Sequence, residues 1–269
     1  MKHTKNGIKF IQANKLVDEE FFGINYTFGK DKVQAKVDDM LLDRLKGYVC
    51  VADGVTLSMS HKNKDLKEVL DESSMTICDS GWVPFYLRFL YHIQREQYSG
   101  SDFLMDRVQA KKYKMMFIGS SSNTLQALKT RLSSIDERIA SMPFVSLPFL
   151  DVSEFNYPEI AQQINEQDPD LIFVSLGMPK QEFFMHRLSP YLNRGILIGV
   201  GAAFKFHSGL ANQKRAPKWM IRLKMEWIFR IFSEPKKQIK RCSLIISSMP
   251  CIFAKECKKR IKEKKKYGS

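Results

Sequence analysis

Two aspartates each follow a short apolar run and precede a small residue. Asp53 comes after VCVA and before Gly54, and Asp79 comes after MTIC and before Ser80. A carboxylate held at the end of a strand can take a proton from an attacking hydroxyl group, as a general base does. The same carboxylate can instead cap a helix by accepting hydrogen bonds from backbone N–H groups. On this pattern alone both roles remain open for Asp79.

Glycine-containing turns after three other apolar runs are candidate anion sites. They lie in FIGSSSNT, VSLGMPKQE and IGVGAAF. Free N–H groups at the start of a helix, together with the helix dipole, attract phosphate oxygens. The turns therefore predict a phosphate-bearing substrate, although FIGSSSNT alone is also typical of a plain strand-to-helix turn. The candidate binding residues in these turns are Gly119, Ser120, Gly177, Pro179, Lys180, Gln181 and Glu182.

Motifs for metals and cofactors are weak in this sequence. The Asp168-Pro169-Asp170 triplet has the DxD form of metal-binding nucleotide-sugar enzymes, but it precedes an apolar run. We expect it at the opposite edge of the sheet, as a helix-to-strand turn. The five cysteines form no CxxC pair, and the GxGxxG fingerprint is absent. We therefore expect no structural zinc, disulfide framework, nicotinamide cofactor or other bound cofactor.

Six short apolar runs alternate with segments of helical periodicity. The expected strands are Tyr48–Val51, Met75–Ile77, Met115–Ile118, Phe144–Leu147, Leu171–Leu176 and Ile196–Val200. The expected helices lie near 62–72, 83–93, 102–112, 122–134, 154–166 and 179–192. This alternation predicts a Rossmann-like α/β fold, with a mostly parallel sheet and helices on both faces. Ligands bind beyond the carboxyl ends of such strands, where the aspartates and glycines stand.

Positive charge is concentrated at one end of the chain. The formal net charge of the 269 residues is +14. From Lys214 onward there are 18 Lys and Arg against four Glu, so the first 213 residues are neutral overall. Such a localised basic segment predicts a negatively charged partner: an anionic bilayer, a nucleic acid or the phosphates of a substrate.

The sequence divides into three expected parts. We expect an α/β body over 1–213, an amphipathic helical appendage over 214–254 that breaks or kinks at Pro250, and a solvated basic tail over 255–269. No apolar run reaches the roughly 20 residues of a spanning helix. The apolar residues of 242–253 are flanked by lysine clusters, which favours contact with the surface of an anionic bilayer.

Three segments of the second half resemble motifs of one bacterial enzyme family. The segments are DPDLIFVSLGMPKQEFFMHR, ILIGVGAAFKFHSG and RAPKWMIRLKMEWIFRIFSEPKKQIKR. They resemble, in the same order and over about 70 residues, motifs of the WecG/TagA/CpsF family of glycosyltransferases, which is glycosyltransferase family 26. The resemblance extends upstream through GSDFLMDRV and FIGSSSNTLQAL to roughly residue 40.

The resemblance implies an inverting enzyme that uses a UDP-sugar donor as its substrate. It implies transfer of an N-acetylmannosamine-type or related hexose to an undecaprenyl-diphosphate-linked acceptor. The products of the family are capsule, teichoic acid or common antigen. It also implies a peripheral enzyme on the inner, cytoplasmic face of a bacterial plasma membrane. An oligomer is allowed, and nucleic acid is not an expected partner.

The family's functional residues map onto particular positions here. By resemblance, Asp79 is the general base, and Gln181 is the glutamine of the PKQE segment. Asp53 falls where the family has an asparagine, and Gln97 falls where it has an active-site arginine, with Arg95 two residues away. The basic residues expected to bind the diphosphate are Arg215, Arg230, Lys237, and Lys240 or Arg241.

Four positions depart from the family pattern. Val51 replaces a threonine, Asp53 an asparagine, Gln97 an arginine, and Lys205 an acidic residue. Because Asp53 adds a negative charge beside a diphosphate and Gln97 removes a cation, the changes predict altered specificity. A catalytically inactive scaffold is the alternative that they leave open.

The basic end leaves a further alternative, binding to nucleic acid. A tail with eight Lys and Arg over 255–266 can neutralise phosphates of any origin. It contains no RGG or aromatic stacking pattern of the kind that RNA-binding segments use. The apolar residues before it favour the bilayer.

Overall fold

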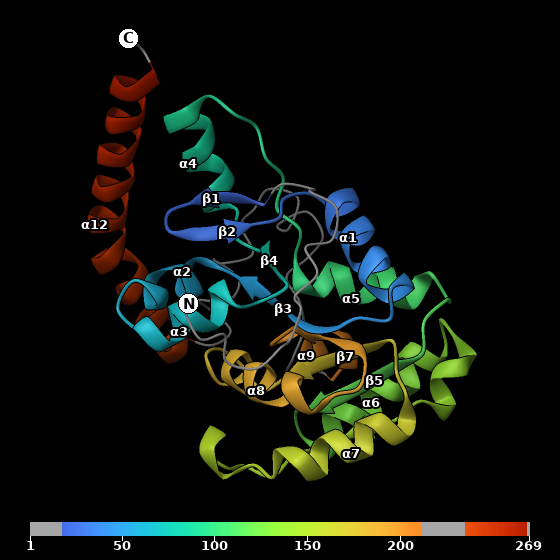
Figure 1. Ribbon diagram of the computed structural model, residues 1–269. Coiled ribbons are helices and arrows are strands. Elements are labelled where there is room, and N and C mark those ends of the chain that lie inside the picture. Colours follow the sequence, from blue (N-terminus) through green and yellow to red (C-terminus); the bar gives the residue numbers. More distant parts are fainter. Residues whose placement is uncertain (1–17, 211–234, 268–269) are drawn as a thin grey trace, which may run out of the picture.

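The structure is a computed structural model that describes residues 18–210 and 235–267 (Figure 1). Its centre is a six-stranded sheet with the order β4-β3-β8-β7-β5-β6, in which every neighbouring pair is parallel. The strands are β3 (Lys46–Ala52), β4 (Met75–Cys78), β5 (Met115–Gly119), β6 (Phe144–Val145), β7 (Leu171–Ser175) and β8 (Gly195–Gly199). All six expected strands and the parallel α/β fold are therefore confirmed, although β6 ends earlier than the sequence suggested.

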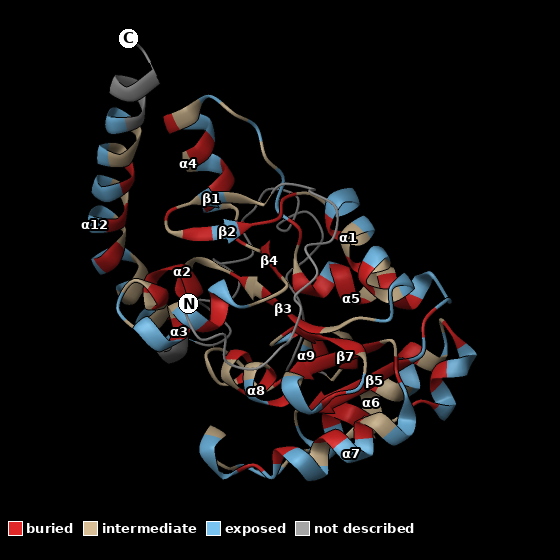
Figure 2. Ribbon diagram, in the orientation of Figure 1, coloured by how far each residue is buried: buried red, intermediate tan, exposed pale blue. Residues whose placement is uncertain are grey.

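Helices cover both faces of this sheet, as Figure 2 shows by the buried strands between partly exposed helices. One face carries α2 (Gly54–Ser60), α3 (Lys64–Asp71), α4 (Trp82–Tyr91), α7 (Tyr157–Gln167) and α8 (Lys180–Leu188). The other carries α1 (Lys30–Leu42), α5 (Gly100–Gln109), α6 (Ser122–Ser133) and α9 (Ala203–Ser208). The described chain also contains short 3-10 helices, which are η1 (Glu137–Ser141), η2 (Val152–Glu154) and η3 (Ser189–Tyr191).

The strand residues alternate between two apolar cores. Leu197 of β8 packs in the first core, whereas Ile196 and Ile198 pack in the second, because side chains alternate along a strand. Strands buried on both sides need apolar residues at every position. This explains why β4, β5, β7 and β8 are buried along their whole length and were recognisable as continuous apolar runs.

A small antiparallel hairpin was not expected from the sequence. It consists of β1 (Glu19–Phe21) and β2 (Ile24–Tyr26), with Phe22 and Gly23 in its turn. The chain leaving β2 then joins the edge of the main sheet, because the Thr27 N–H donates to the Thr76 carbonyl at 2.8 Å. The helices α1, α2 and α9 were also not expected.

The C-terminal helix α12 (Pro235–Tyr267) corrects two expectations. It continues as one helix through Pro250, where a kink or a break was expected, and through 255–267, where a solvated tail was expected. The break is therefore wrong, whereas the kink stays a prediction. Side chains on both sides of Pro250 are buried, Ser248 being 4% and Ile252 2% exposed. This burial favours the helix on both sides of Pro250 despite the backbone hydrogen bond that a proline cannot make.

Beyond Pro250, Glu256 fixes the second half of α12 to the hairpin and to α4. Its carboxylate accepts hydrogen bonds from the Phe22 N–H at 3.0 Å and the Tyr91 hydroxyl at 2.5 Å. The expected boundary between 254 and 255 therefore falls inside an anchored helix. The helix expected over 214–232 lies outside the described residues. Within the described ranges, none of the helices combines the length and the apolarity needed to cross a membrane.

Candidate functional site

The carboxyl ends of the parallel strands gather most of the predicted site residues. The loops after β3 and β7 lead to helices on one face of the sheet, and those after β5 and β8 lead to the other face. Adjacent loops that turn to opposite faces leave a crevice at the strand ends, where α/β proteins bind ligands. The expected position of the site is thus at the β3-β8-β7-β5 portion of this edge.

Asp53 and Asp79 lie on neighbouring strand ends. Ala52 of β3 and Cys78 of β4 are paired residues, and each aspartate follows one of them. The Asp79 N–H donates to the Ala52 carbonyl at 3.0 Å, so the backbone holds the two acidic positions next to each other. Asp79 is partly exposed, which leaves its side chain accessible to a substrate.

Asp53 caps helix α2. Its Oδ1 atom accepts hydrogen bonds from the N–H groups of Val55 and Thr56, both at 2.9 Å. Its Oδ2 atom contacts the guanidinium of Arg241 from α12. Asp53, for which the sequence predicted substrate binding, is thus the N-cap of α2, and the ion pair brings one predicted diphosphate ligand to the strand ends.

Gln181 and Glu182 connect the loops that follow β7 and β8. The Gln181 side chain accepts a hydrogen bond from the Gly201 N–H at 3.1 Å and donates to Glu182 Oε1 at 3.0 Å. Ser175, which the sequence analysis did not single out, donates to the Gly201 carbonyl at 2.6 Å. Gln181 thus fixes the shape of the site from inside, because its side chain is only 3% exposed.

Glu182 is a fully buried acid behind the strand ends. Burial, the largest cause, and the charge of Asp53 raise the pKa of its carboxyl from 4.5 to about 7, against hydrogen bonds that lower it. Its Oε2 atom has no hydrogen-bond partner among the described residues. Its side chain is 0% exposed, and its predicted role in substrate binding stays a prediction.

Two of the three predicted glycine turns differ in the space around them. Gly119 has φ +96°, and a Cβ atom there would lie 2.7 Å from the Ser175 carbonyl oxygen. Gly177 has φ +79°, and none of the described residues has an atom within 4 Å of the position of a Cβ there. The Gly119–Ser120 turn is thus closely packed on β7, whereas the backbone at Gly177 is open to a ligand.

Lys180 makes contacts away from these turns. It follows Pro179, the N-cap residue of α8, and its ammonium donates to the Leu150 carbonyl. The same ammonium lies over the rings of Phe149 and Phe155, at 5.0 and 5.3 Å from their centroids. In this arrangement Lys180 holds the chain between β6 and α7, and its phosphate role stays a prediction.

Gln97 lies in the loop that returns alongside β4. The next residue, Tyr98, donates its N–H to the Cys78 carbonyl at 2.9 Å, which brings the exposed Gln97 close to the backbone of Asp79. Arg95 cannot simply replace the missing arginine, because its guanidinium forms an ion pair with Glu19 at 2.6 Å.

The remaining basic candidates are described only in part. Lys237 belongs to α12, and Arg215 and Arg230 lie outside the described residues. In the portion of the chain that the structure describes, no group of three His, Cys, Asp or Glu residues is arranged to hold a metal ion.

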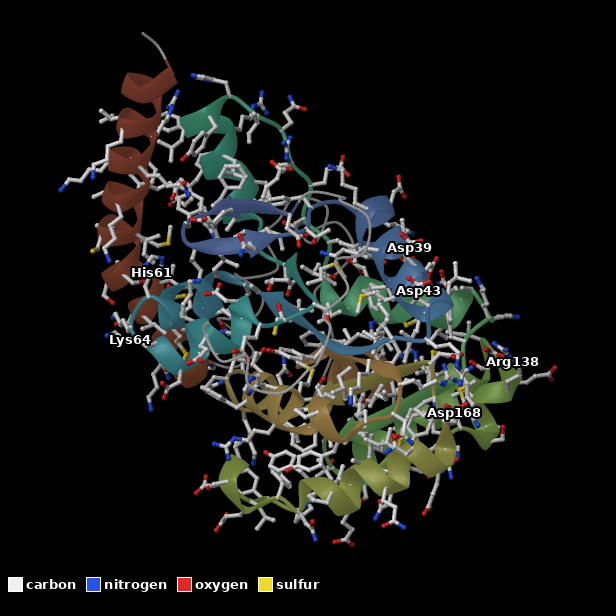
Figure 3. The ribbon with its side chains drawn as sticks, in the orientation of Figure 1. Asp39, Asp43, His61, Lys64, Arg138 and Asp168 are labelled. Carbon is white, nitrogen blue, oxygen red and sulfur yellow. The ribbon has the colours of Figure 1, made fainter. Side chains whose placement is uncertain are left out.

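The DxD triplet lies where the sequence analysis expected it. Asp168 ends α7 and Asp170 precedes β7, so both stand at the amino ends of the strands (Figure 3 labels Asp168). The Arg194 guanidinium bonds to both carboxylates, at 2.9 Å for Asp170, and holds the pKa of Asp168 below its usual range. The triplet is thus a structural turn on the side opposite to Asp79.

Comparison with known proteins identifies the group to which this architecture belongs. The sequence model described as "Glycosyl transferase WecG/TagA/CpsF family" matches residues 20–266. The chain belongs to this family. The match covers the whole of the six-stranded sheet and all but the last residue of α12, and it confirms the resemblance drawn from the sequence motifs. The family is one of enzymes that transfer sugars.

Two relatives from bacilli carry the same name. A Bacillus subtilis (strain 168) protein is 29% identical over 178 residues, which are 65% of this chain and 66% of the relative, just under two thirds of its length. A Bacillus spizizenii protein is 26% identical over 204 residues, 73% of this chain and 75% of the relative. Both are named N-acetylglucosaminyldiphosphoundecaprenol N-acetyl-beta-D-mannosaminyltransferase.

Proposed function

We propose that this protein is a hexosyltransferase that moves an N-acetylmannosamine-type sugar from a UDP-sugar to N-acetylglucosaminyl-diphosphoundecaprenol. The family match and the shared name of the two relatives support the reaction class and the acceptor. The observation that carries the proposal in this chain is the pairing of strand ends that sets Asp79 beside Asp53. The expected product is a cell-surface polysaccharide precursor, and the names of the relatives support neither the scaffold nor the nucleic-acid hypothesis.

Asp79 acts as the general base in the proposed mechanism. Its carboxylate accepts the proton of the acceptor hydroxyl while that oxygen attacks the anomeric carbon from the face opposite to UDP. The bond to the UDP oxygen breaks as the new glycosidic bond forms, so the configuration inverts. General-base catalysis of this kind is worth about 10²–10⁴-fold in rate.

The leaving UDP gains negative charge and needs positive partners. Arg241, which α12 brings to Asp53, is the described cation best placed to bind the diphosphate. An arginine can donate two parallel hydrogen bonds to phosphate oxygens. The open backbone at Gly177, just before α8, adds N–H groups at the start of a helix.

The basic end also places the enzyme at its lipid-linked substrate. Helix α12 exposes Ile239, Ile246 and Ile261 among its lysines, with 63%, 71% and 55% exposed. Exposed apolar side chains among cations bind the interface of an anionic bilayer. We therefore place the protein on the cytoplasmic face of the plasma membrane, as a peripheral enzyme.

The test is acceptor-dependent release of UDP by the full-length protein. A panel of UDP-sugars is offered with a diphosphate-linked N-acetylglucosamine acceptor, and Asp79→Asn is compared with Asp39→Asn. Asp39 is an exposed aspartate on α1, the helix that leads into the amino end of β3, opposite to the end that Asp53 follows (Figure 3). We expect UDP-N-acetylmannosamine to be used, Asp79→Asn to lose at least about 100-fold in kcat, and Asp39→Asn to keep the rate. Equal activity of Asp79→Asn would remove it as the base.

A further inference from the structure

Helix α4 is apolar on the side that faces solvent as well as on the side that faces the core. Val83, Leu87 and Leu90 are buried in the core. On the outer side, Trp82, Phe85 and Phe89 are 52%, 59% and 67% exposed. A surface helix of a globular protein normally carries polar residues on its outer face. The outer side of α4 therefore needs a partner.

The three outer aromatic side chains form one stripe. They stand at positions i, i+3 and i+7 of the helix, which lie on the same face. The Trp82 ring contacts the Phe85 ring at 6.2 Å and stacks on Tyr86 at 6.3 Å between centroids. Within WVPFYLRFLY, Arg88 is the single charged residue. The stripe is thus a continuous aromatic surface.

Helix α12, which carries many of the cations, packs against α4 next to this stripe. The two helices run next to each other (Figure 1), with the Tyr86 and Phe253 rings 5.5 Å apart. The Arg260 guanidinium stands 5.5 Å from the centroid of the Tyr91 ring, near the end of α4. On the outside of α12, Lys255, Lys258 and Lys262 are exposed. An aromatic surface on one helix, next to a second helix with exposed lysines, matches the interface of a membrane that contains anionic lipids.

We propose that Trp82, Phe85 and Phe89 insert into the interfacial region of an anionic bilayer while the α12 cations bind the lipid headgroups. The inference rests on the proposed function for the presence of a lipid-linked acceptor. This contact would place the bilayer near Asp79, because α4 begins three residues after it. A bilayer held by this stripe keeps the diphosphate of a membrane-anchored acceptor near the base, while the lipid chain remains in the membrane.

The experiment is flotation of the full-length protein with vesicles of phosphatidylcholine alone or with an equal part of phosphatidylglycerol. The test variant is F85A/F89A. The control is L42A/Y191A, which removes two exposed apolar side chains, 77% and 51% exposed, at the opposite edge of the sheet. We expect F85A/F89A to lower partition into the anionic vesicles at least about tenfold, because two aromatic side chains lose their burial in lipid. The control should change it less than about twofold.

A conservative variant keeps the test independent of helix stability. F85L/F89L retains apolar side chains and should keep partition within about threefold of wild type. Equal partition of F85A/F89A and wild type would overturn the inference. A second result would also overturn it. If the lipid-free wild type is a dimer, and F85A/F89A is a monomer that still partitions like wild type, then the stripe binds a second copy of this chain.

Flotation is separable from turnover. Asp79→Asn should float like wild type, and F85A/F89A should keep the wild-type rate on an acceptor with a short, water-soluble chain. Loss of flotation by F85A/F89A in a protein that turns over no donor would refute the proposed function and leave the membrane contact standing. If the wild type turns over the donor and F85A/F89A floats like wild type, the proposed function stands and the membrane contact of α4 is refuted.

Discussion

The guanidinium of Arg241 contacts the carboxylate of Asp53, joining the C-terminal helix α12 to the end of strand β3. Both side chains are about one-third exposed, 31% and 30%. An ion pair with this exposure contributes at most about 1 kcal/mol to stability. Its importance is positional, since the same guanidinium is a candidate ligand for the donor diphosphate. We therefore expect Asp53 to compete with the diphosphate for Arg241.

The first prediction concerns Asp53→Asn. Asparagine caps a helix as well as aspartate does, so α2 should keep its start and Tm should change little. Removing the negative charge frees Arg241 and reduces repulsion of the diphosphate. We expect KM for the UDP-sugar to fall about threefold to tenfold, since a gain of 1.4 kcal/mol is tenfold in affinity. Steady-state kinetics measure this.

The matched control for Asp53→Asn is Asp65→Asn. Asp65 is exposed in the first turn of α3, so the variant makes the same change of charge at a helix start away from Arg241. It should leave KM within about twofold of wild type. A KM that rises in Asp53→Asn would show that the carboxylate helps to bind the donor.

The sheet was predictable from the sequence because four of its strands, β4, β5, β7 and β8, are buried along their whole length. Leu171–Ser175 and Gly195–Gly199 are apolar at nearly every position and are bounded by turn residues. Because all the strands are parallel, their order along the chain placed Asp53 and Asp79 at one edge without any knowledge of the strand order. The same logic put Asp168 at the other edge.

Elements that depend on tertiary contacts were not predictable in this way. The strands β1 and β2 have three residues each, too short to show an alternating pattern. Pro250 indicated a kink or a break because local preference disfavours proline within a helix, whereas the helix continues past it with Ser248 and Ile252 buried on either side. The Arg241–Asp53 ion pair joins residues 188 apart, and no local pattern indicates it.

A second prediction compares Gly119→Ala with Gly177→Ala. Both glycines have positive φ, so each substitution costs about 1 kcal/mol of backbone strain. At Gly119 the new Cβ also meets the Ser175 carbonyl at 2.7 Å, whereas at Gly177 it meets nothing within 4 Å. We expect Gly119→Ala to unfold at least about 1 kcal/mol more easily than Gly177→Ala, by urea denaturation. Gly177→Ala should instead raise KM for the donor, because its methyl group enters the space left for a ligand. Equal stability of the two variants would contradict this packing argument.

A third prediction concerns the buried amide of Gln181. Gln181→Ala removes the acceptor for the Gly201 N–H and the donor to Glu182. A buried polar group left without its partner costs about 1–3 kcal/mol. We expect a loss of stability of that size by urea denaturation, with a reduced kcat because the loops after β7 and β8 lose their connection. Gln162→Ala, an exposed site on α7, should cost less than about 0.5 kcal/mol. If both variants were equally stable, the hydrogen bonds of Gln181 would not contribute to the stability of the fold.

The last prediction concerns the pH dependence set by Glu182. Burial raises the pKa of this carboxyl from 4.5 to about 7 in the folded protein, so the folded state holds its proton more tightly than the unfolded state does. The stabilisation is therefore complete below about pH 4.5, falls as pH rises, and is gone above about pH 7. Integrated over that interval the effect is of the order of 3 kcal/mol.

Glu182→Gln should remove this pH dependence, because glutamine has nearly the same shape and no titrating proton. The difference in unfolding free energy between the variant and wild type, measured by urea denaturation, should grow in favour of the variant from pH 5 to pH 7.5. Glu68→Gln on the surface of α3 serves as the control and should follow wild type. Asp53→Asn should shift the interval to lower pH, since the charge of Asp53 is one cause of the raised pKa. A constant difference between Glu182→Gln and wild type across this range would mean that Glu182 titrates at its ordinary pKa.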